Sequence, residues 1–88
     1  MSFSEAITWE KMRVDINLDE NGNDWTLQIN PIDRRGSSYV VSGRIDQFQI
    51  ISILSWARRL GYTDLFCTKF EAELRLLFTQ AASSTVMY

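Results

Sequence analysis

Residues 12–18 read Met-Arg-Val-Asp-Ile-Asn-Leu, and this stretch decides the fold. Its apolar side chains fall on even positions and its polar side chains on odd positions. Strict alternation at a period of two is typical of a strand with one buried face and one solvent face. The pattern extends from Trp9 to Asp19, so we predict a strand there, with Lys11 and Arg13 on the solvent face.

Two more stretches downstream have the same period. Asn21-Gly22 favours a tight hairpin turn, because both residues tolerate a positive φ. Apolar and polar residues then alternate over 25–29, and Pro31 marks the end of that strand because it has no amide hydrogen. A second turn at 33–38 precedes a third alternating stretch at 39–45. The sequence therefore predicts a three-stranded antiparallel meander.

The period changes to that of a helix after the third strand. Asp46 and Gln49 have the spacing of a capping box, in which each side chain binds a backbone amide of the first turn. Apolar residues follow at helical spacing as far as Leu60, and Gly61 is typical of the residue just beyond a helix C-terminus. We predict a helix over 46–60.

A second amphipathic stripe predicts another helix. Thr68 and Glu71 have capping-box spacing, and from Phe70 apolar residues recur at helical intervals as far as Ala81. Residues 65–67 fit either a first helical turn or a short extended piece. Residues 82–88 show no period and are expected to fray.

The predicted fold is α+β, with the element order (α)βββαα. The bracketed helix is an alternative: Ser2 and Glu5 have the spacing that caps a short helix before Trp9. We expect residues 1–88 to form one small globular domain, a three-stranded antiparallel meander packed on one face by two C-terminal helices. The predicted core consists of Val14, Ile16, Trp25, Leu27, Ile29, Val41, Ile50, Ile53, Leu54, Ala57, Phe70, Leu74 and Leu77.

Composition removes several classes of enzyme. The chain contains no histidine, so His-based triads and imidazole metal sites are excluded, and a single cysteine allows no disulfide within the chain. Acidic residues gather at 19–24, but without the ligand spacing of a calcium loop. We therefore expect no enzyme, no metal site and no cofactor. Cys67 is interpreted as a small buried hydrophobe, with a reactive thiol as the alternative.

Charge and targeting signals say little about a partner. Nine Lys plus Arg against eleven Asp plus Glu give a formal net charge of -2. This balance argues against nucleic acid, whose binding domains usually carry a basic surface. The N-terminus lacks the pattern of a secretory signal, and no apolar run is long enough for a membrane span. We expect a cytoplasmic protein.

Candidate binding residues are basic or aromatic. Guanidinium groups pair with carboxylates and phosphates, and Trp, Tyr and Arg dominate the energetics of protein interfaces. The basic candidates lie on the solvent face of the sheet or in the turn before Gly36. The aromatic ones do not fit the apolar helical stripes, or are expected on the outer sheet face. The candidates are Trp9, Lys11, Arg13, Arg34, Arg35, Arg44, Phe48 and Trp56.

These observations predict a small stand-alone protein-binding module, a stoichiometric inhibitor of another protein. In general organisation the chain is similar to small inhibitors of phages and mobile elements, such as anti-CRISPR proteins, and to bacterial toxin-immunity proteins. Several of these place a short meander beside two helices. The similarity covers organisation and no shared motif, so it implies an inhibitory function and transfers no residue role. A nucleic-acid-binding domain that contacts phosphates through a sheet face or the Arg turn, and a homo-oligomeric subunit, remain as alternatives.

Overall fold

The computed structural model describes residues 4–18, 24–34, 37–44 and 48–84. It contains a four-stranded antiparallel sheet and two helices, which is an α+β class. The chain divides into two compact units, which we call the sheet unit (Met1–Phe48) and the helical unit (Gln49–Tyr88).

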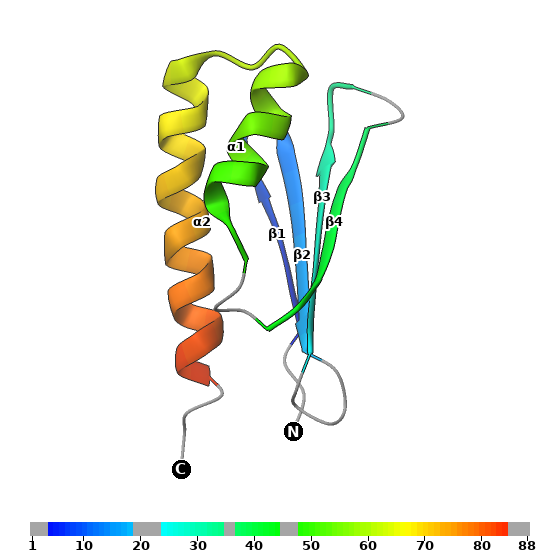
Figure 1. Cartoon of the computed structure of the whole chain (residues 1–88), viewed down its shortest axis with the longest axis vertical. Coiled ribbons are helices and arrows are strands. Elements are labelled where there is room, and N and C mark those ends of the chain that lie inside the picture. Colours follow the sequence, from blue (N-terminus) through cyan, green and yellow to red (C-terminus); the bar gives the residue numbers. More distant parts are fainter. Residues whose placement is uncertain (1–3, 19–23, 35–36, 45–47, 85–88) are drawn as a thin grey trace. The chain divides into compact units, whose positions relative to one another are not determined.

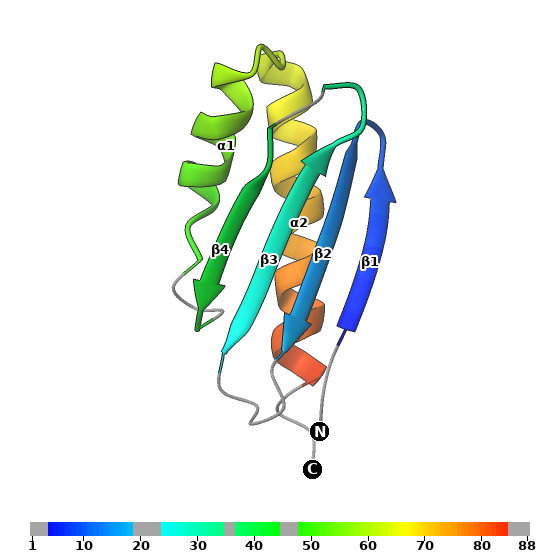
Figure 2. The same cartoon turned by 90° about the vertical axis from the view of Figure 1, so that its right-hand side faces the viewer.

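The sheet unit is a simple antiparallel meander. Its strands are β1 (Ser4–Trp9), β2 (Met12–Leu18), β3 (Trp25–Pro31) and β4 (Tyr39–Gly43). They lie side by side in sequence order, with β1 and β4 at the two edges (Figures 1 and 2). The predicted meander is confirmed, but it has four strands where the sequence predicted three.

The additional strand replaces the N-terminal helix that we considered. That alternative is wrong, because Ser4–Trp9 is β1 and pairs with β2 along its whole length. The segment itself alternates: Glu5, Ile7 and Trp9 lie on one face and the small residues between them on the other. The period of two predicts the strand correctly, whereas the capping-box spacing of Ser2 and Glu5 suggests a helix that does not form over Ser4–Trp9.

A two-residue turn divides the strand that we predicted over 9–19. Trp9 pairs with Met12, so Glu10 and Lys11 connect β1 to β2. Glu10 has a φ of 49°, the only positive value at a non-glycine among the described residues. The backbone amide of Ile32 donates to the Lys11 carbonyl at 2.8 Å, which holds this turn beside the end of β3.

The predicted alternation of β2 and β3 is confirmed. Their inward residues are all 9% exposed or less, and the residues between them lie toward solvent. Directly opposed residues in an antiparallel pair share a face, so the register assigns the inward residues of β2 and β3 to one apolar face. These buried residues are Met12, Val14, Ile16, Leu18, Trp25, Leu27 and Ile29.

The last strand ends earlier than predicted. Gly43 has a φ of 143°, which favours glycine, and β4 stops there. The predicted continuation to Ile45 lies outside the described residues.

Helix α1 (Ile50–Arg59) has a well-formed C-terminus. Gly61 has a φ of 99°, its amide donates to the Arg58 carbonyl, and the amide of Tyr62 donates to the Ala57 carbonyl. These two bonds form a Schellman motif, as the position of Gly61 predicted. The N-terminus differs, because Gln49 is the N-cap residue and makes no side-chain cap bond. The predicted start at Asp46 is therefore wrong.

Helix α2 (Asp64–Ser84) begins earlier than its predicted capping box. The backbone amide of Phe66 donates to Oγ1 of Thr63 at 3.1 Å, so Thr63 is the N-cap. Thr68 lies inside the helix, where its hydroxyl donates to the Asp64 carbonyl at 3.0 Å. The prediction of a Thr68–Glu71 cap is wrong, and residues 65–67 form the first helical turn. The helix also includes 82–84, which we expected to fray.

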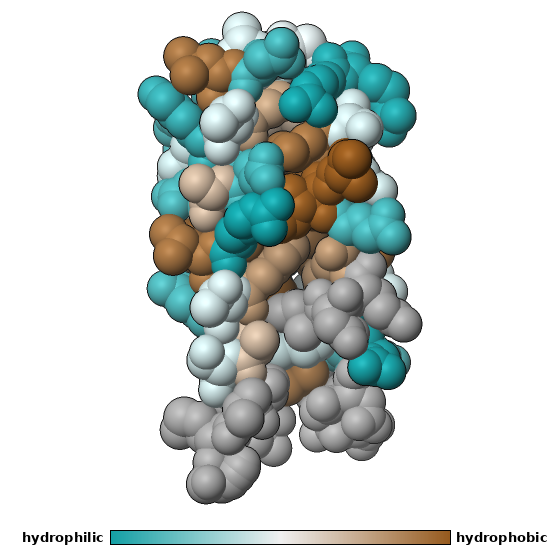
Figure 3. Space-filling model, turned by 60° about the vertical axis from the view of Figure 1, so that its left-hand side comes forward, coloured by the Kyte–Doolittle hydropathy of each residue, from teal (hydrophilic) through white to brown (hydrophobic). Residues whose placement is uncertain are grey.

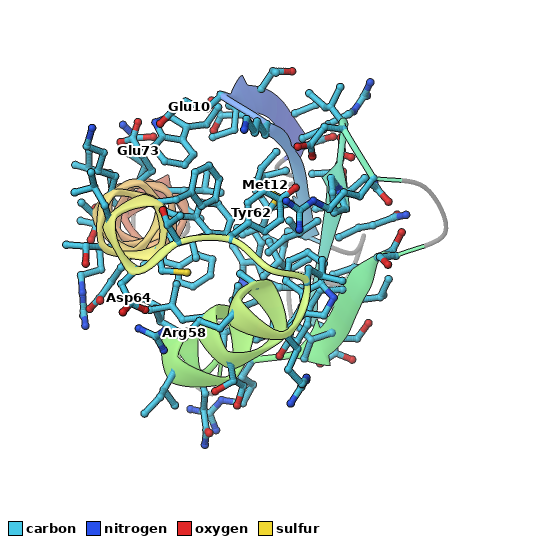
Figure 4. The ribbon with its side chains drawn as sticks, turned by 90° about the horizontal axis from the view of Figure 1, so that it is seen from above. Glu10, Met12, Arg58, Tyr62, Asp64 and Glu73 are labelled. Atoms are coloured by element: carbon cyan, nitrogen blue, oxygen red, sulfur yellow. The ribbon has the colours of Figure 1, made fainter. Side chains whose placement is uncertain are left out.

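The connection between the helices carries a salt bridge and ring contacts. Nε of Arg58 lies 3.3 Å from Oδ1 of Asp64, and the two side chains approach each other in Figure 4. Tyr62 stacks on Phe66 with a centroid distance of 4.7 Å, and Phe66 lies 6.0 Å from Phe70. Residues of the helical unit that are 9% exposed or less are Ile53, Leu54, Trp56, Ala57, Tyr62, Cys67, Phe70, Leu74, Leu77 and Ala81.

The solvent side of the helices mixes apolar and polar groups. Ile51 on α1 and Leu65 and Leu76 on α2 are 58–70% exposed. Figure 3 shows apolar surface on this side interrupted by hydrophilic areas. No helix in the described ranges combines the length and the apolar character needed to cross a bilayer.

Candidate functional site

The sheet presents one polar face, which we call the outer face. It is formed by the residues that alternate with the buried ones, and the register brings them together from all four strands. All of them are exposed or half-buried. The outer face consists of Ser4, Ala6, Thr8, Arg13, Asp15, Asn17, Thr26, Gln28, Asn30, Val40 and Ser42.

Hydrogen bonds between strands order several of these side chains. Ser4 on β1 donates to Oδ1 of Asn17 on β2 at 2.6 Å. The hydroxyls of Thr26 on β3 and Ser42 on β4 lie 3.4 Å apart. Such cross-strand pairs stabilise a sheet by a few tenths of a kcal/mol to about 1 kcal/mol each. They also restrict the rotamers of these four side chains.

Asn30 collects two further hydrogen bonds at one end of the outer face. Its Oδ1 accepts from the Ser38 hydroxyl at 2.6 Å and from Nε2 of Gln28 at 3.4 Å. Gln28 lies opposite Asp15 on β2 and Val40 on β4, near the middle of the face. A substitution at Gln28 therefore changes the outer face near its centre.

The outer face carries little charge. Its two charged residues, Arg13 and Asp15, form a salt bridge with Nε 3.4 Å from Oδ2. The Arg13 side chain is 57% exposed, so the pair contributes only a small stabilisation. Within the outer face the positive and negative charges cancel.

The basic residues that we predicted as binding candidates are divided between the two ends of the sheet. Lys11 precedes β2 at the end where β3 finishes, whereas Arg44 follows β4 at the end where β3 begins. A strand of this length separates the two ends by roughly 20 Å. Arg34 lies near the Lys11 end, with Nε 3.9 Å from Oδ2 of Asp33, and Arg35 lies outside the described residues.

Trp9 does not lie with the outer-face residues. We expected it to share the solvent face of the sheet, but it pairs with Met12 and therefore lies on the apolar face. The reason is the turn at Glu10 and Lys11. In one unbroken strand over 9–19, Trp9 would share a face with the other odd-numbered residues, such as Arg13. The two-residue turn reverses the chain instead, so Trp9 lies opposite Met12 and shares its face.

The other two aromatic candidates belong to different units. Phe48 closes the sheet unit and is half-buried, and Trp56 on α1 is only 9% exposed. A residue that is buried to this extent offers little ring surface to a partner. Neither residue is part of the outer face.

Two exposed apolar residues near the outer face were missed. Ile32, in the segment after β3, is 60% exposed, and Val40 on β4 is 59% exposed. Val40 lies on the polar side of a strand pattern and Ile32 directly follows Pro31. Val40 could have been predicted from the sequence, because it is an apolar residue at a position that the alternating pattern assigns to solvent.

Cys67 is fully buried in the helical unit. Burial raises the pKa of its thiol above the ordinary value of 9.0, the nearby Arg58 charge lowers it less, and Asp64 raises it. Since the thiolate is the reactive form, this environment supports the interpretation of Cys67 as a small hydrophobe. Among the described residues no three His, Cys, Asp or Glu side chains gather to hold a metal ion.

Comparison with known proteins identifies no relative: no family model matches the sequence, and no curated protein or solved structure matches the chain. A functional interpretation therefore rests on the residues described above.

Proposed function

We propose that this chain is a protein-binding module that acts as a stoichiometric inhibitor, covering a surface of its partner with the outer face of the sheet. The observation that supports this most is the combination of exposure, order and low charge on that face. Side chains from four strands reach solvent, hydrogen bonds between them limit their motion, and the two charged groups compensate each other.

Each of these properties lowers the free-energy cost of binding. Side chains that already hold one rotamer lose less conformational entropy when a partner covers them. Hydroxyl and amide groups cost less to remove from water than unpaired charges do. Val40 adds an exposed apolar contact on the same face, next to Gln28 across the strand pair.

The distribution of charge favours a protein partner over nucleic acid. At the end of the sheet near the first turn, each basic residue is accompanied by an acidic residue on the same turn or strand. Proteins that bind phosphates need uncompensated Lys and Arg, because binding is driven by the release of counterions. The residues concerned are Glu10, Lys11, Arg13, Asp15, Asp33 and Arg34.

The proposal is tested by quantitative affinity capture from a lysate of the source cells with three baits. These are the wild-type chain, Gln28→Arg on the outer face, and Gln80→Arg on the exposed side of α2 as a matched control. Arginine at position 28 lies opposite Asp15, so the fold is not expected to suffer. We expect one protein captured at a 1:1 ratio, at least tenfold less of it with Gln28→Arg, and wild-type yield with Gln80→Arg.

Other outcomes would overturn the proposal. Equal capture by all three baits places the contact elsewhere on the chain. Capture that disappears after nuclease treatment, or that falls steeply with salt from ~50 mM upward, indicates nucleic acid as the partner.

A further inference from the structure

The two edges of the sheet differ in how they are protected against pairing with another strand. On β1, Glu5 lies opposite Ile16 and therefore on the apolar face. A charge directed inward on an edge strand is a known device against edge-to-edge association, since a newly added strand would bury it. Edge β4 reads Tyr-Val-Val-Ser-Gly and contains neither a charge nor a proline.

The composition of β4 favours pairing. An edge strand offers a row of backbone N–H and C=O groups, and β-branched residues without charge are typical of strands that pair. Val40 is 59% exposed, although it lies on the polar side of the sheet. An exposed valine on an edge strand without charge or proline is a liability for a lone chain and an anchor for an added strand.

We propose that a second copy of this chain adds its β4 antiparallel to β4, with the two-fold axis at Val40, so that the two sheets become continuous. The symmetry places Val40 opposite Val40 of the partner subunit, and Tyr39 opposite Val41 of the partner subunit. Ser38 then lies opposite Ser42 of the partner subunit. Apolar, aromatic–β-branched and hydroxyl pairs of this kind stabilise antiparallel strands, and no like charges meet over residues 38–42.

A second copy fits this edge because the strand is self-complementary in that register. The contact is small: one short strand from each subunit covers less than the ~800 Å² per partner of a standard interface. We therefore expect a weak, concentration-dependent dimer, with a dissociation constant in the high micromolar range. The outer face keeps its exposure in such a dimer, so the inference does not depend on the proposed function.

Sedimentation velocity from ~10 µM to ~1 mM tests the association with purified chain alone. Wild type is expected to move from the mass of one chain toward that of two. Val40→Lys, which places a charge on the edge, is expected to weaken dimerisation at least tenfold. Ala6→Lys makes the same kind of change on the outer face of β1, where position 6 lies opposite Asp15, and is expected to behave like wild type. A wild type that remains monomeric throughout, or a dimer that Ala6→Lys disrupts and Val40→Lys does not, overturns the proposal.

Disulfide trapping tests the register. Opposed residues of antiparallel strands have Cα atoms about 4.5–5.5 Å apart, within the range that a disulfide spans. Under mild oxidation Val40→Cys is expected to form a cross-linked dimer, whereas Ser42→Cys, which lies opposite Ser38 of the partner subunit, is not. The wild-type chain is the control, because Cys67 is buried. Cross-linking of Ser42→Cys at least as fast as Val40→Cys would exclude the axis at Val40.

Discussion

Trp9 lies directly opposite Met12, and this pairing leaves only Glu10 and Lys11 to reverse the chain. Glu10 accommodates the reversal with a φ of 49°, a region that disfavours residues with a Cβ atom. The first hairpin therefore carries local strain at one identified residue.

We expect Glu10→Gly to stabilise the protein by up to about 1 kcal/mol, because glycine adopts positive φ without the steric penalty. Thermal unfolding followed by circular dichroism should show a Tm higher by about 4–8 °C for a gain of that size. Lys11→Gly is the matched control and is expected to lower stability, since glycine there only adds freedom to the unfolded chain. A lower Tm for Glu10→Gly would show that this turn is not strained.

Two threonines near the start of α2 have opposite expected effects. Thr63 caps the helix through the amide of Phe66, so Thr63→Ala should cost about 1 kcal/mol. Thr68 donates to a carbonyl inside the helix, and Thr68→Ala should change stability by less than about 0.5 kcal/mol because alanine is the better helix former. Urea unfolding of both variants measures the difference. Equal losses would contradict the assignment of Thr63 as the cap.

Cys67 should make stability depend on pH in the alkaline range. Burial raises the pKa of the thiol in the folded protein, so the unfolded chain loses this proton first as pH rises. Stability is therefore expected to fall above about pH 9, with a limiting slope of about 1.4 kcal/mol per pH unit until the folded thiol also ionises.

Comparison of the wild type with Cys67→Ala isolates this contribution, because the two proteins share every titratable group except the Cys67 thiol. The difference in unfolding free energy between wild type and variant is expected to shrink as pH rises from about 8 to 10. In the native protein at pH 8 the thiol should react with a disulfide reagent far more slowly than in urea. A difference that stays constant with pH, or a thiol that reacts quickly in the native state, would contradict burial of Cys67.

The sequence predicted those elements whose period is long and unbroken. Alternation placed the buried faces of β2 and β3 correctly, and helical spacing placed Ile53, Leu54 and Ala57 on α1 and Phe70, Leu74 and Leu77 on α2. Gly61 ended α1 as expected because a positive φ leaves few alternatives to glycine.

The predictions were wrong where a local sequence pattern competes with pairing to a residue that is distant in sequence. Ser2 and Glu5 have capping-box spacing, but pairing of β1 with β2 makes the segment a strand. Thr63 and Thr68 both precede apolar helical spacing, and the sequence gives no reason to prefer the earlier cap. The Glu10–Lys11 turn contains no glycine or asparagine, so turn chemistry did not reveal it.

The candidate site was predicted only in part. Arg13 lies on the outer face as expected, but it is paired with Asp15, and Arg44 lies at the far end of the sheet from Lys11. The uncharged residues that form most of the outer face were not predicted as binding residues, because single Ser, Thr and Asn residues carry no motif. Only the register of four strands assembles them.

Site-specific photo-cross-linking tests the central claim of a protein partner on the outer face most directly. A photoreactive phenylalanine derivative is introduced at Gln28 in one sample and at Gln80 in another, since both are exposed glutamines on different units. After irradiation in lysate, position 28 is expected to give one 1:1 protein adduct that unlabelled wild-type chain competes away, and position 80 none. A protein adduct from position 80 alone, or a nuclease-sensitive adduct from position 28, would contradict the claim.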